Sequence, residues 1–416
     1  MKRVLNARER KIVGLAAELA DAFAPRAGDL DRDAAFPHEN YRIMRDAGYL
    51  KLTVPEEFGG MGASLYELML AQERLAMGDA GTALAVNMHL TPIGQWAGIW
   101  RITRNKAIED ALRRAGEGSL IWAGFTSEAG VENVIMGANT KATKVDGGFL
   151  VNGYKVFCTN IEIATDFTIS VQLDDPIRGS ELLLLKTNKG APGLRPIRNW
   201  DVAGMRATQS GDLEIKDLFV PDENVVHRQP IGHFNEVIAR TILCWGVTSF
   251  GAVYSGIGAG ALAWAVDIAK KRNRHKEPMV RQLFAEMEVL LECGRAVAYR
   301  HAKEVEEGAI FEQLTMQEVM SRAALAKIVP VNNTLTIMNK IIEAVGSPTF
   351  MKKYPFERML RDAQAGPLMP FSNIVAHRLF AATTFGEEIA PTSPAEELDR
   401  ARASAARPGE SILKAV

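Results

Sequence analysis

The sequence contains few cysteines. Its three, Cys158, Cys244 and Cys293, lie far apart among 416 residues and form no CxxC pair or Cys/His ligand spacing. A disulfide-stapled domain and a zinc site are therefore not expected, and we predict no metal. A reducing, cytoplasmic setting fits this use of cysteine.

An excess of charge of one sign is also missing. The chain has 49 basic and 50 acidic side chains and a formal net charge of -1, so nucleic acid is not an expected partner. It also lacks a GxGxxG segment after a strand and the GxxxxGK[ST], GxSxG and HExxH motifs. Dinucleotide-fold dehydrogenases, P-loop enzymes, hydrolases and zincins are therefore not indicated.

Only one stretch of the chain is long and uncharged. The N-terminus, MKRVLNARERKIVGL, carries charges throughout and is not typical of a signal peptide. Residues 241–266 contain no charged side chain and are long enough to cross a membrane. The stretch also contains five glycines and several hydroxyl groups. We therefore predict a helix buried in a helical bundle or subunit interface and no membrane span.

Hydrophobic periodicity divides the chain into four parts. Residues 1–117 show helical spacing, whereas residues 118–230 change to short alternating runs separated by Asp-Gly, Asn-Gly and proline breaks. Residues 231–386 return to long helical periodicity, and residues 387–416 lose it and gather proline, serine, alanine and charge. The pattern predicts a helical domain, a β domain, a second helical domain and a tail.

Individual helices are predicted from the same spacing. In the first domain Ser64 is a plausible helix cap after the loop VPEEFGGMGAS. The predicted helices are residues 7–23, 40–46 and 65–77 in the first domain, and 234–272, 279–307, 315–344 and 355–385 in the second.

Three segments in and around the β domain resemble a known family. They are AGFTSEAGVENV (123–134), NGYKVFCTN (152–160) and GMRATQSGDLEIKDLFVP (204–221), accompanied by VPEEFGGMG and by FERMLRDA (356–363). Their order and spacing resemble the acyl-CoA dehydrogenase superfamily, whose segments read close to TEPxAGSD, NGxKxWITN and GxRxSxTxxxxFxxVxVP. The resemblance implies an α+β multidomain fold: an N-terminal all-α domain, a middle β-barrel or sandwich domain and a C-terminal four-helix bundle.

The resemblance also implies a flavin cofactor. FAD is expected, with FMN or a diffusible reduced flavin as the alternative. The residues that align with cofactor contacts are Phe125, Thr126, Ser127, Asn133, Phe157, Thr159, Gly346 and Ser372. Phe157 stands where the family usually has Trp, and each hydroxyl has the alternative of a purely structural role. Two segments that usually reach the adenosine end of FAD in a neighbouring subunit are weakened here to KKRNRHKEPMV and EAVGSPTF.

The catalytic base of the family has no counterpart in this chain. The usual glutamate position holds Pro370, and the position used by a minority of members holds Ala239. Proline cannot abstract a proton, so His89, Glu236 and His377 are the candidates for proton transfer. His89 is the foremost of them, because it lies on the segment that lines the acyl pocket in the family. A hydrogen-bonded structural histidine is the alternative.

Three functions remain open from the sequence. The first is α,β-dehydrogenation of an acyl thioester carried by CoA or by a carrier protein, with an electron-acceptor protein or O₂ receiving the electrons. The second is a flavin-dependent monooxygenase on the same fold, with His89 beside the reacting centre. The third is a degenerate member that binds an acyl ligand without redox chemistry. The family resemblance also implies a homodimer or homotetramer.

Overall fold

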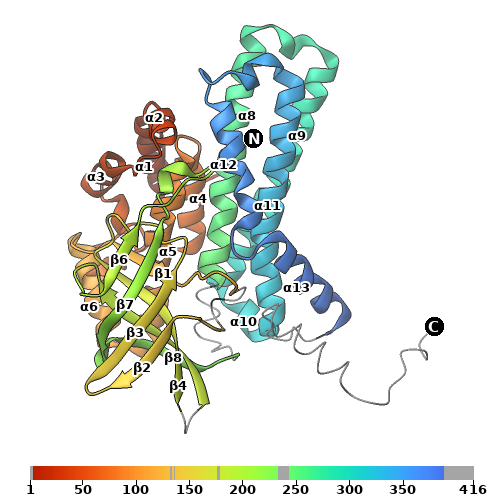
Figure 1. Cartoon of the computed structure of the whole chain (residues 1–416). Helices are drawn as coiled ribbons and strands as arrows, with labels where there is room; N and C mark the ends of the chain where they lie inside the picture. Colours follow the sequence, from red (N-terminus) through yellow and green to blue (C-terminus); the bar gives the residue numbers. More distant parts are fainter. Residues whose placement is uncertain (1–2, 132–133, 135, 176–178, 233–242, 388–416) are drawn as a thin grey trace, which may run out of the picture.

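The computed structural model describes residues 3–131, 134, 136–175, 179–232 and 243–387. Within these residues a helical region is followed by a β-sheet and then by a second helical region. Figure 1 shows the sheet and the N-terminal helices on one side of a long helical bundle. The predicted order of helical, β and helical parts is confirmed.

Four of the N-terminal helices, α1, α4, α5 and α6, begin after a residue whose side chain caps them. The Ser64 hydroxyl accepts a hydrogen bond from the Glu67 amide and Glu67 returns one to the Ser64 amide, so the predicted cap is confirmed as a capping box. Asn6 and Glu9 form the same motif at the first helix. The helices are α1 (Ala7–Phe23), α2 (Ala27–Arg32), α3 (His38–Asp46), α4 (Leu65–Ala76), α5 (Ala80–Thr103) and α6 (Lys106–Glu117).

The eight described strands form one branched sheet. They are β1 (Trp122–Phe125), β2 (Lys141–Val145), β3 (Gly148–Lys155), β4 (Asp166–Asp175), β5 (Gly179–Asn188), β6 (Leu194–Ile197), β7 (Asp212–Pro221) and β8 (Val225–Pro230). The order along the sheet is β6-β7-β3-β2-β4-β5-β8, and β1 pairs in parallel with β4. Alternate residues of these strands, such as Phe149, Val151 and Ile169, form a core together with residues of the loop after β3.

The second helical region surrounds one apolar helix. Its elements are the π-helical turn η5 (Leu243–Val247), α8 (Thr248–Lys271), α9 (Pro278–Glu307), α10 (Ala309–Gln313), α11 (Met316–Val345), α12 (Phe356–Gln364) and α13 (Asn373–Phe385). Helices α1, α4 and α5 share one continuous core with α8, α9, α11 and α12, to which Leu68, Ile257 and Ile341 belong. The sheet therefore packs as a separate unit against a single helical body.

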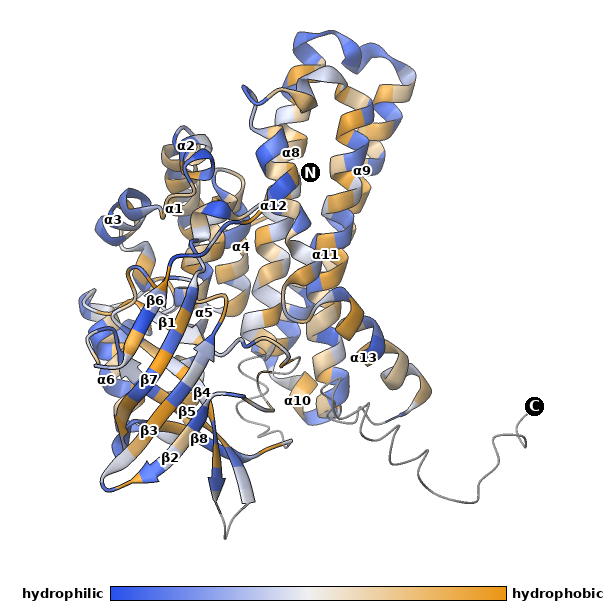
Figure 2. Cartoon of the chain, in the orientation of Figure 1, coloured by the Kyte–Doolittle hydropathy of each residue, from blue (hydrophilic) through white to orange (hydrophobic). Residues whose placement is uncertain are grey.

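Helix α8 explains the uncharged stretch of the sequence. Residues Cys244–Lys271 form the one described helix that is long and apolar enough to cross a membrane, and 72% of its most apolar window is buried inside the protein. A Cβ atom at Gly256 would lie 2.3 Å from the Glu73 carbonyl oxygen, so glycine lets α8 approach α4 closely. Figure 2 shows hydrophilic residues gathered at the far end of the bundle, beyond this apolar segment. The predicted burial in a helical bundle is confirmed.

One predicted helix is wrong. The periodicity over 355–385 predicts a single helix, but the structure has α12 and α13 with a 3₁₀ turn, η8 (Gly366–Leu368), between them. Gly366, Pro367 and Pro370 interrupt the helix because proline lacks the amide hydrogen that the helical ladder requires. This break shapes the segment in which the family carries its base.

Candidate functional site

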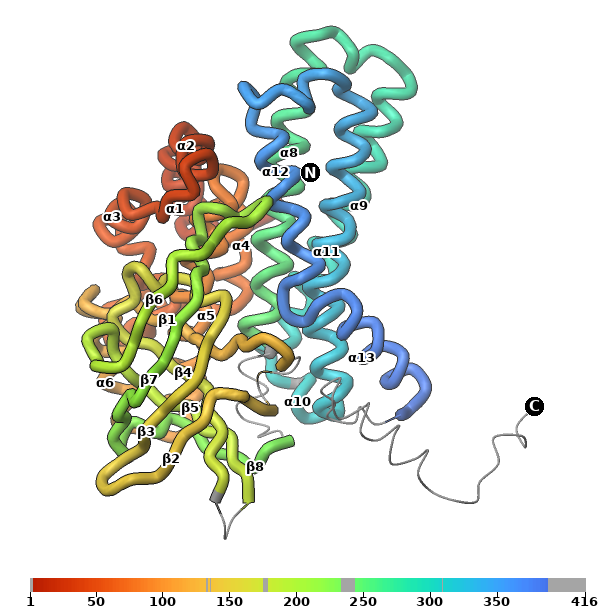
Figure 3. The backbone as a smooth tube through the Cα atoms, viewed as in Figure 1, coloured from red at the N-terminus to blue at the C-terminus, as the bar shows by residue number. Residues whose placement is uncertain are grey.

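The loop after β1 is fastened to the end of β3. The Val156 amide donates to the Ser127 carbonyl oxygen at 3.0 Å, and the Ser170 hydroxyl donates to the Thr126 carbonyl oxygen at 3.3 Å. The hydroxyl groups of Thr126 and Ser127 have no hydrogen-bond partner within the described part of the chain. Figure 3 shows this segment extending from the sheet toward the bundle. Its two free hydroxyls are therefore held in place and available to a ligand.

A buried ion pair also holds the loop after β1 in place. Glu128 accepts hydrogen bonds from the Asn139 amide, from the amide and hydroxyl of Thr140, and from the ammonium of Lys155. The Lys155 ammonium also donates to the Ser170 carbonyl and hydroxyl oxygens at 2.5 and 3.0 Å. Burial alone would raise the pKa of Glu128, but Lys155 and the other donors hold it below its ordinary value. The family alignment did not single out this pair.

Phe157 presents an exposed aromatic ring next to this loop. Its side chain is 61% exposed, and its backbone has a φ of +56°. The Trp200 ring meets it edge to face, with 5.8 Å between the ring centroids. A positive φ is costly for a residue with a bulky side chain, so the fold directs this ring outward at a free-energy cost. An outward aromatic plane with a supporting indole suits a planar ligand such as an isoalloxazine ring.

A chain of hydroxyl groups runs beside the aromatic pair. The hydroxyl oxygens of Thr159 and Ser210 lie 2.7 Å apart, and the Ser210 hydroxyl donates to that of Thr208 at 2.9 Å. The Thr208 hydroxyl donates in turn to the Met205 carbonyl oxygen at 3.0 Å. The structure thus brings the predicted residues Phe157 and Thr159 together with the third sequence segment. The chemistry of these groups suits a flavin. An aromatic face, free hydroxyls and a chain of hydroxyl groups all belong to the β region.

Two further predicted residues of this region lie apart from that surface. The Phe125 side chain is 1% exposed and packs against Phe167 at a centroid distance of 4.6 Å. Its side chain therefore belongs to the core of the sheet, and its backbone pairs with Ile169 of β4. Asn133 lies outside the described residues.

The two predicted residues of the bundle are placed elsewhere. Gly346 ends α11 with a φ of +76°, and a Cβ atom there would lie 3.5 Å from the Arg274 guanidinium. That end of α11 is distant from the sheet (Figure 1), so Gly346 and Phe157 of one chain do not meet. Ser372 caps α13, with its hydroxyl 3.5 Å from the Val375 amide.

His89 is held by two backbone groups. It is fully buried on α5; its Nε2 lies 3.0 Å from the Leu50 carbonyl oxygen, and its Nδ1 accepts from the Trp122 amide at 3.0 Å. The two contacts identify the neutral tautomer with hydrogen on Nε2. Burial lowers the pKa of His89 to about 4. Both nitrogens are occupied in this conformation, which favours a structural role and leaves the proton-transfer role a prediction.

The expected position of the base offers no carboxylate. Pro370 is exposed, and Ala239 and Glu236 lie outside the described residues. His377 is exposed on α13. Among the described residues, a titratable group that hydrogen-bonds to this segment is Lys327 of α11, which is fully buried and donates to the Phe371 carbonyl oxygen at 3.0 Å.

A buried lysine is an unusual neighbour for the segment that begins with Pro370. The Lys327 ammonium also lies 3.4 Å from the Asn373 side-chain oxygen, and no ion pair to it is found among the described residues. Burial lowers the pKa of Lys327 to about 8. A buried amine therefore replaces a carboxylate as the titratable group beside the segment that begins with Pro370.

Comparison with known proteins identifies the family. The model of the acyl-CoA dehydrogenase N-terminal domain matches residues 6–113, and that of the acyl-CoA dehydrogenase C-terminal domain matches residues 237–369. The chain belongs to the acyl-CoA dehydrogenase superfamily. Its resemblance from sequence and its fold class are thereby confirmed.

Individual relatives of this superfamily member differ in their reactions. The putative acyl-CoA dehydrogenase YdbM of Bacillus subtilis is 29% identical, over 91% of this chain and 98% of that protein. The amino sugar nitrososynthase DnmZ of Streptomyces peucetius is also 29% identical, over 88% of this chain and 89% of that protein. A solved structure of KijD3 with FMN and a dTDP-linked amino sugar is 25% identical with a TM-score of 0.85, and it covers 94% of this chain and 96% of that one.

The same fold also occurs in butyryl-CoA dehydrogenase and in a methanesulfinate monooxygenase. Membership in this superfamily supports an oxidoreductase with a flavin cofactor, so the predicted flavin is confirmed at that level. Dehydrogenases, nitrososynthases and monooxygenases all share the scaffold, so the fold is compatible with each of these reactions. The choice between them depends on the residues around the flavin.

Proposed function

We propose that this superfamily member is a flavin-dependent monooxygenase. The observation that carries the proposal is Pro370 in the register of the usual base, with the buried amine of Lys327 hydrogen-bonded to that segment and no carboxylate of the described residues bonded to it. Removal of a Cα proton from a thioester needs a base of suitable pKa within reach of that carbon. A monooxygenation needs no carboxylate at this position.

The overall reaction balances without such a base. Reduced flavin, when bound, supplies two electrons and two protons to O₂. One oxygen atom enters the substrate and the other leaves as water. The contribution of the chain is to hold the flavin at Phe157, Thr126, Ser127 and Thr159, to orient the substrate and to exclude bulk water. FMN is favoured over FAD by its presence in the KijD3 complex and by the weakened KKRNRHKEPMV and EAVGSPTF segments.

Dehydrogenation of an acyl thioester is the second candidate. The match to YdbM over nearly its whole length favours it, and so does the retention of the FERMLRDA segment. Acyl-CoA or an acyl carrier protein would then be the substrate, and a homodimer or homotetramer would bring Gly346 of one chain to the flavin of another.

The two candidates are separated by anaerobic and aerobic assays on the purified, flavin-loaded protein. A panel of butyryl-, isovaleryl- and octanoyl-CoA is added without O₂ while the visible absorbance of the flavin is followed. The proposal expects no bleaching, and it expects reduced FMN bound to the protein to consume O₂. Bleaching by any of these thioesters would overturn the proposal in favour of dehydrogenation.

A matched pair of variants tests the role of position 370. Pro370→Glu supplies the missing carboxylate, and Pro370→Gln has nearly the same shape without the charge. If the pocket keeps the geometry of the dehydrogenases, Pro370→Glu gains acyl-CoA oxidation and Pro370→Gln does not. Equal inactivity of the two variants would mean that substrate and flavin are arranged differently from a dehydrogenase, as the proposal expects.

A further inference from the structure

The backbone of Met205 connects groups from two parts of the molecule. Its amide donates to the Asp362 carboxylate at 2.6 Å. Its carbonyl oxygen accepts from the Trp200 indole at 3.2 Å and from the Thr208 hydroxyl at 3.0 Å. Met205 is 2% exposed and has a φ of +54°, so this peptide is fixed in an uncommon conformation by its partners.

The aromatic pair and the hydroxyl chain of the proposed flavin site both contact the Met205 carbonyl oxygen. Trp200 supports the Phe157 ring edge to face, and Thr208 continues through Ser210 to the Thr159 hydroxyl. The aromatic face and the hydroxyl chain therefore share one anchor. A change in the backbone conformation of Met205 would displace the carbonyl oxygen that both of them share.

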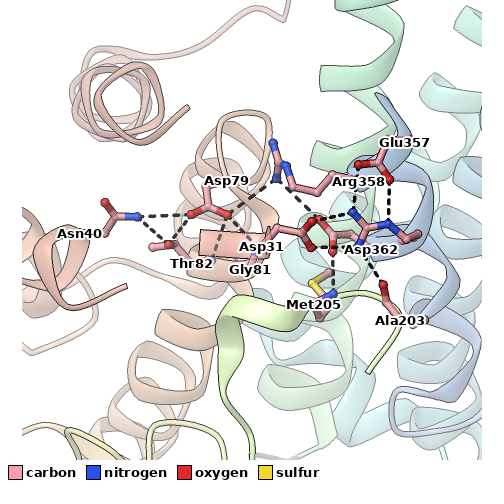
Figure 4. A network of polar contacts seen from close by, with 11 residues as sticks. Asp31, Asn40, Asp79, Gly81, Thr82, Ala203, Met205, Glu357, Arg358 and Asp362 are labelled. Atoms are coloured by element: carbon pink, nitrogen blue, oxygen red, sulfur yellow. Dashed lines mark hydrogen bonds and ion pairs between the residues drawn. The ribbon is translucent and has the colours of Figure 1, made fainter. Parts of the chain in front are cut away.

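The residue that holds the Met205 amide belongs to the helical bundle. Asp362 is buried on α12, and the loop before Met205 lies directly on that helix: a Cβ atom at Gly204 would be 2.1 Å from the Arg361 carbonyl oxygen. The Arg361 guanidinium also donates to the Ala203 carbonyl oxygen at 2.9 Å. Figure 4 shows Met205 and Ala203 beside the charged groups of α12.

Charged groups from other elements surround Asp362. Its second oxygen lies 3.7 Å from the Arg358 guanidinium, which lies 4.0 Å from Asp79, the residue that caps α5. Arg361 binds Asp31 with two hydrogen bonds of 3.0 and 2.6 Å. Figure 4 shows that these groups form one network between the N-terminal helices and α12. The contacts of the Asp362 carboxylate itself are thus the Arg358 guanidinium and the Met205 amide, whereas Asp31 bonds to Arg361.

We propose that Asp362 is a positioning residue of the flavin site, acting through the backbone of Met205 on the aromatic pair and the hydroxyl chain. The inference rests on the proposed placement of the flavin at Phe157 and Thr159. It assigns to the bundle a direct part in shaping a site built on the sheet. A carboxylate suits this task, because a hydrogen bond from an amide to an ionised acceptor is shorter and stronger than a neutral one.

The test compares flavin affinity among variants of one junction. Asp362→Ala removes the acceptor, whereas Asp362→Asn keeps an oxygen at the same place. Asp31→Asn breaks a neighbouring ion pair of α12 without touching Met205 and is the matched control. The dissociation constants of FMN and FAD are measured by fluorescence titration, with the visible circular dichroism of the bound flavin as the spectroscopic signature.

Asp362→Ala is expected to weaken flavin binding about tenfold and to alter the dichroism, as loss of a hydrogen bond to a charged group implies. Asp362→Asn and Asp31→Asn are expected to stay within about threefold of the parent. Parental affinity and dichroism in Asp362→Ala would overturn the proposal. Equal weakening in Asp31→Asn would also overturn it, because the effect would then be a general loosening of the junction.

Two further variants keep the test decisive. Thr208→Val breaks the link to the hydroxyl chain without touching the buried charges, so it serves if Asp362→Ala does not fold. Parental flavin affinity and dichroism in Thr208→Val would overturn the proposal that Met205 acts on the flavin site through the hydroxyl chain. Phe157→Ala tests the flavin placement separately. If Phe157→Ala binds flavin like the parent, the placement itself fails, and the inference about Asp362 fails with it for a distinguishable reason.

Discussion

Replacement of His89 by leucine tests whether this residue is a structural link. Leucine has a similar volume but forms no hydrogen bond. The substitution leaves the Leu50 carbonyl and the Trp122 amide without their side-chain partner inside the protein. These two groups belong to different parts of the fold, so His89 joins α5 to the 3₁₀ turn η1 (Tyr49–Lys51) and to β1.

The expected loss of stability follows from the two backbone groups that lose their hydrogen-bond partner. A buried polar group left without a partner costs about 1–3 kcal/mol, so His89→Leu should lower the free energy of unfolding by about 2–6 kcal/mol at pH 7.5. His301 provides the matched control. It is 3% exposed on α9, and neither ring nitrogen has a hydrogen-bond partner among the residues that the structure describes. His301→Leu should therefore leave stability unchanged or raise it.

Urea unfolding of both variants at a fixed flavin concentration measures the difference. A gap below about 1 kcal/mol between the two variants would refute the structural role of His89. A His89→Leu protein that unfolds like the parent but turns over about 10²-fold more slowly would instead support proton transfer. The comparison thus separates the two interpretations of this residue.

The pH dependence gives an independent check with a defined sign. Burial lowers the pKa of His89 from 6.5 to about 4, and burial together with nearby arginines lowers that of His301 equally. The unfolded chain takes up these protons first as pH falls below 6.5, so each histidine contributes stability at neutral pH that is lost toward pH 4. At pH 5 the loss is about 2 kcal/mol for each residue. Each leucine variant should therefore gain about 2 kcal/mol relative to the parent between pH 7.5 and pH 5.

Three other substitutions have expected outcomes. Lys155→Met leaves Glu128 buried without its cation and should cost about 3–5 kcal/mol; a double-mutant cycle by urea unfolding should show that Glu128→Gln recovers part of this loss, and additive effects would argue against the pair. Phe157→Ala should weaken flavin binding about tenfold with little change in unfolding, because the ring is 61% exposed. Gly204→Ala places a methyl 2.1 Å from a carbonyl oxygen of α12 and should lower the free energy of unfolding by about 1–3 kcal/mol. Gly137→Ala, with open space around it, should be neutral. Equal urea midpoints for the two variants would contradict the close packing at Gly204.

Local features of the fold were predictable from the sequence. The capping box at Ser64 and the helix over Ala7–Phe23 follow from neighbours three and four residues apart. The helix predicted over 355–385 failed although the evidence against it was in the sequence. Apolar spacing continues through Gly366 and Pro370, but the helix breaks here, where a glycine and two prolines lie within five residues. Pro92 and Pro330, by contrast, are accommodated inside α5 and α11.

The groups that hold the site together were missed. Asp362 and Met205 are 157 residues apart, and Glu128 and Lys155 are 27 apart, so no local pattern connects them. A signal was present for Lys155, since the alternation of β3 places it on the same face as the buried Phe149. A charged residue on the inner face of a strand indicates a buried partner.

The sequence by itself determined the order of the helical and β parts, the family and the candidate flavin segments, because periodicity, turn residues and motifs are properties of neighbouring residues. Only the tertiary structure decided what the titratable groups do. His89 is neutral because Leu50 and Trp122, which are remote in the chain, enclose it. Asp362 contacts the β region because α12 lies against the loop at Gly204. Burial and hydrogen-bond partners set the charge state and role of a side chain, and both are supplied by segments that meet only in the folded chain.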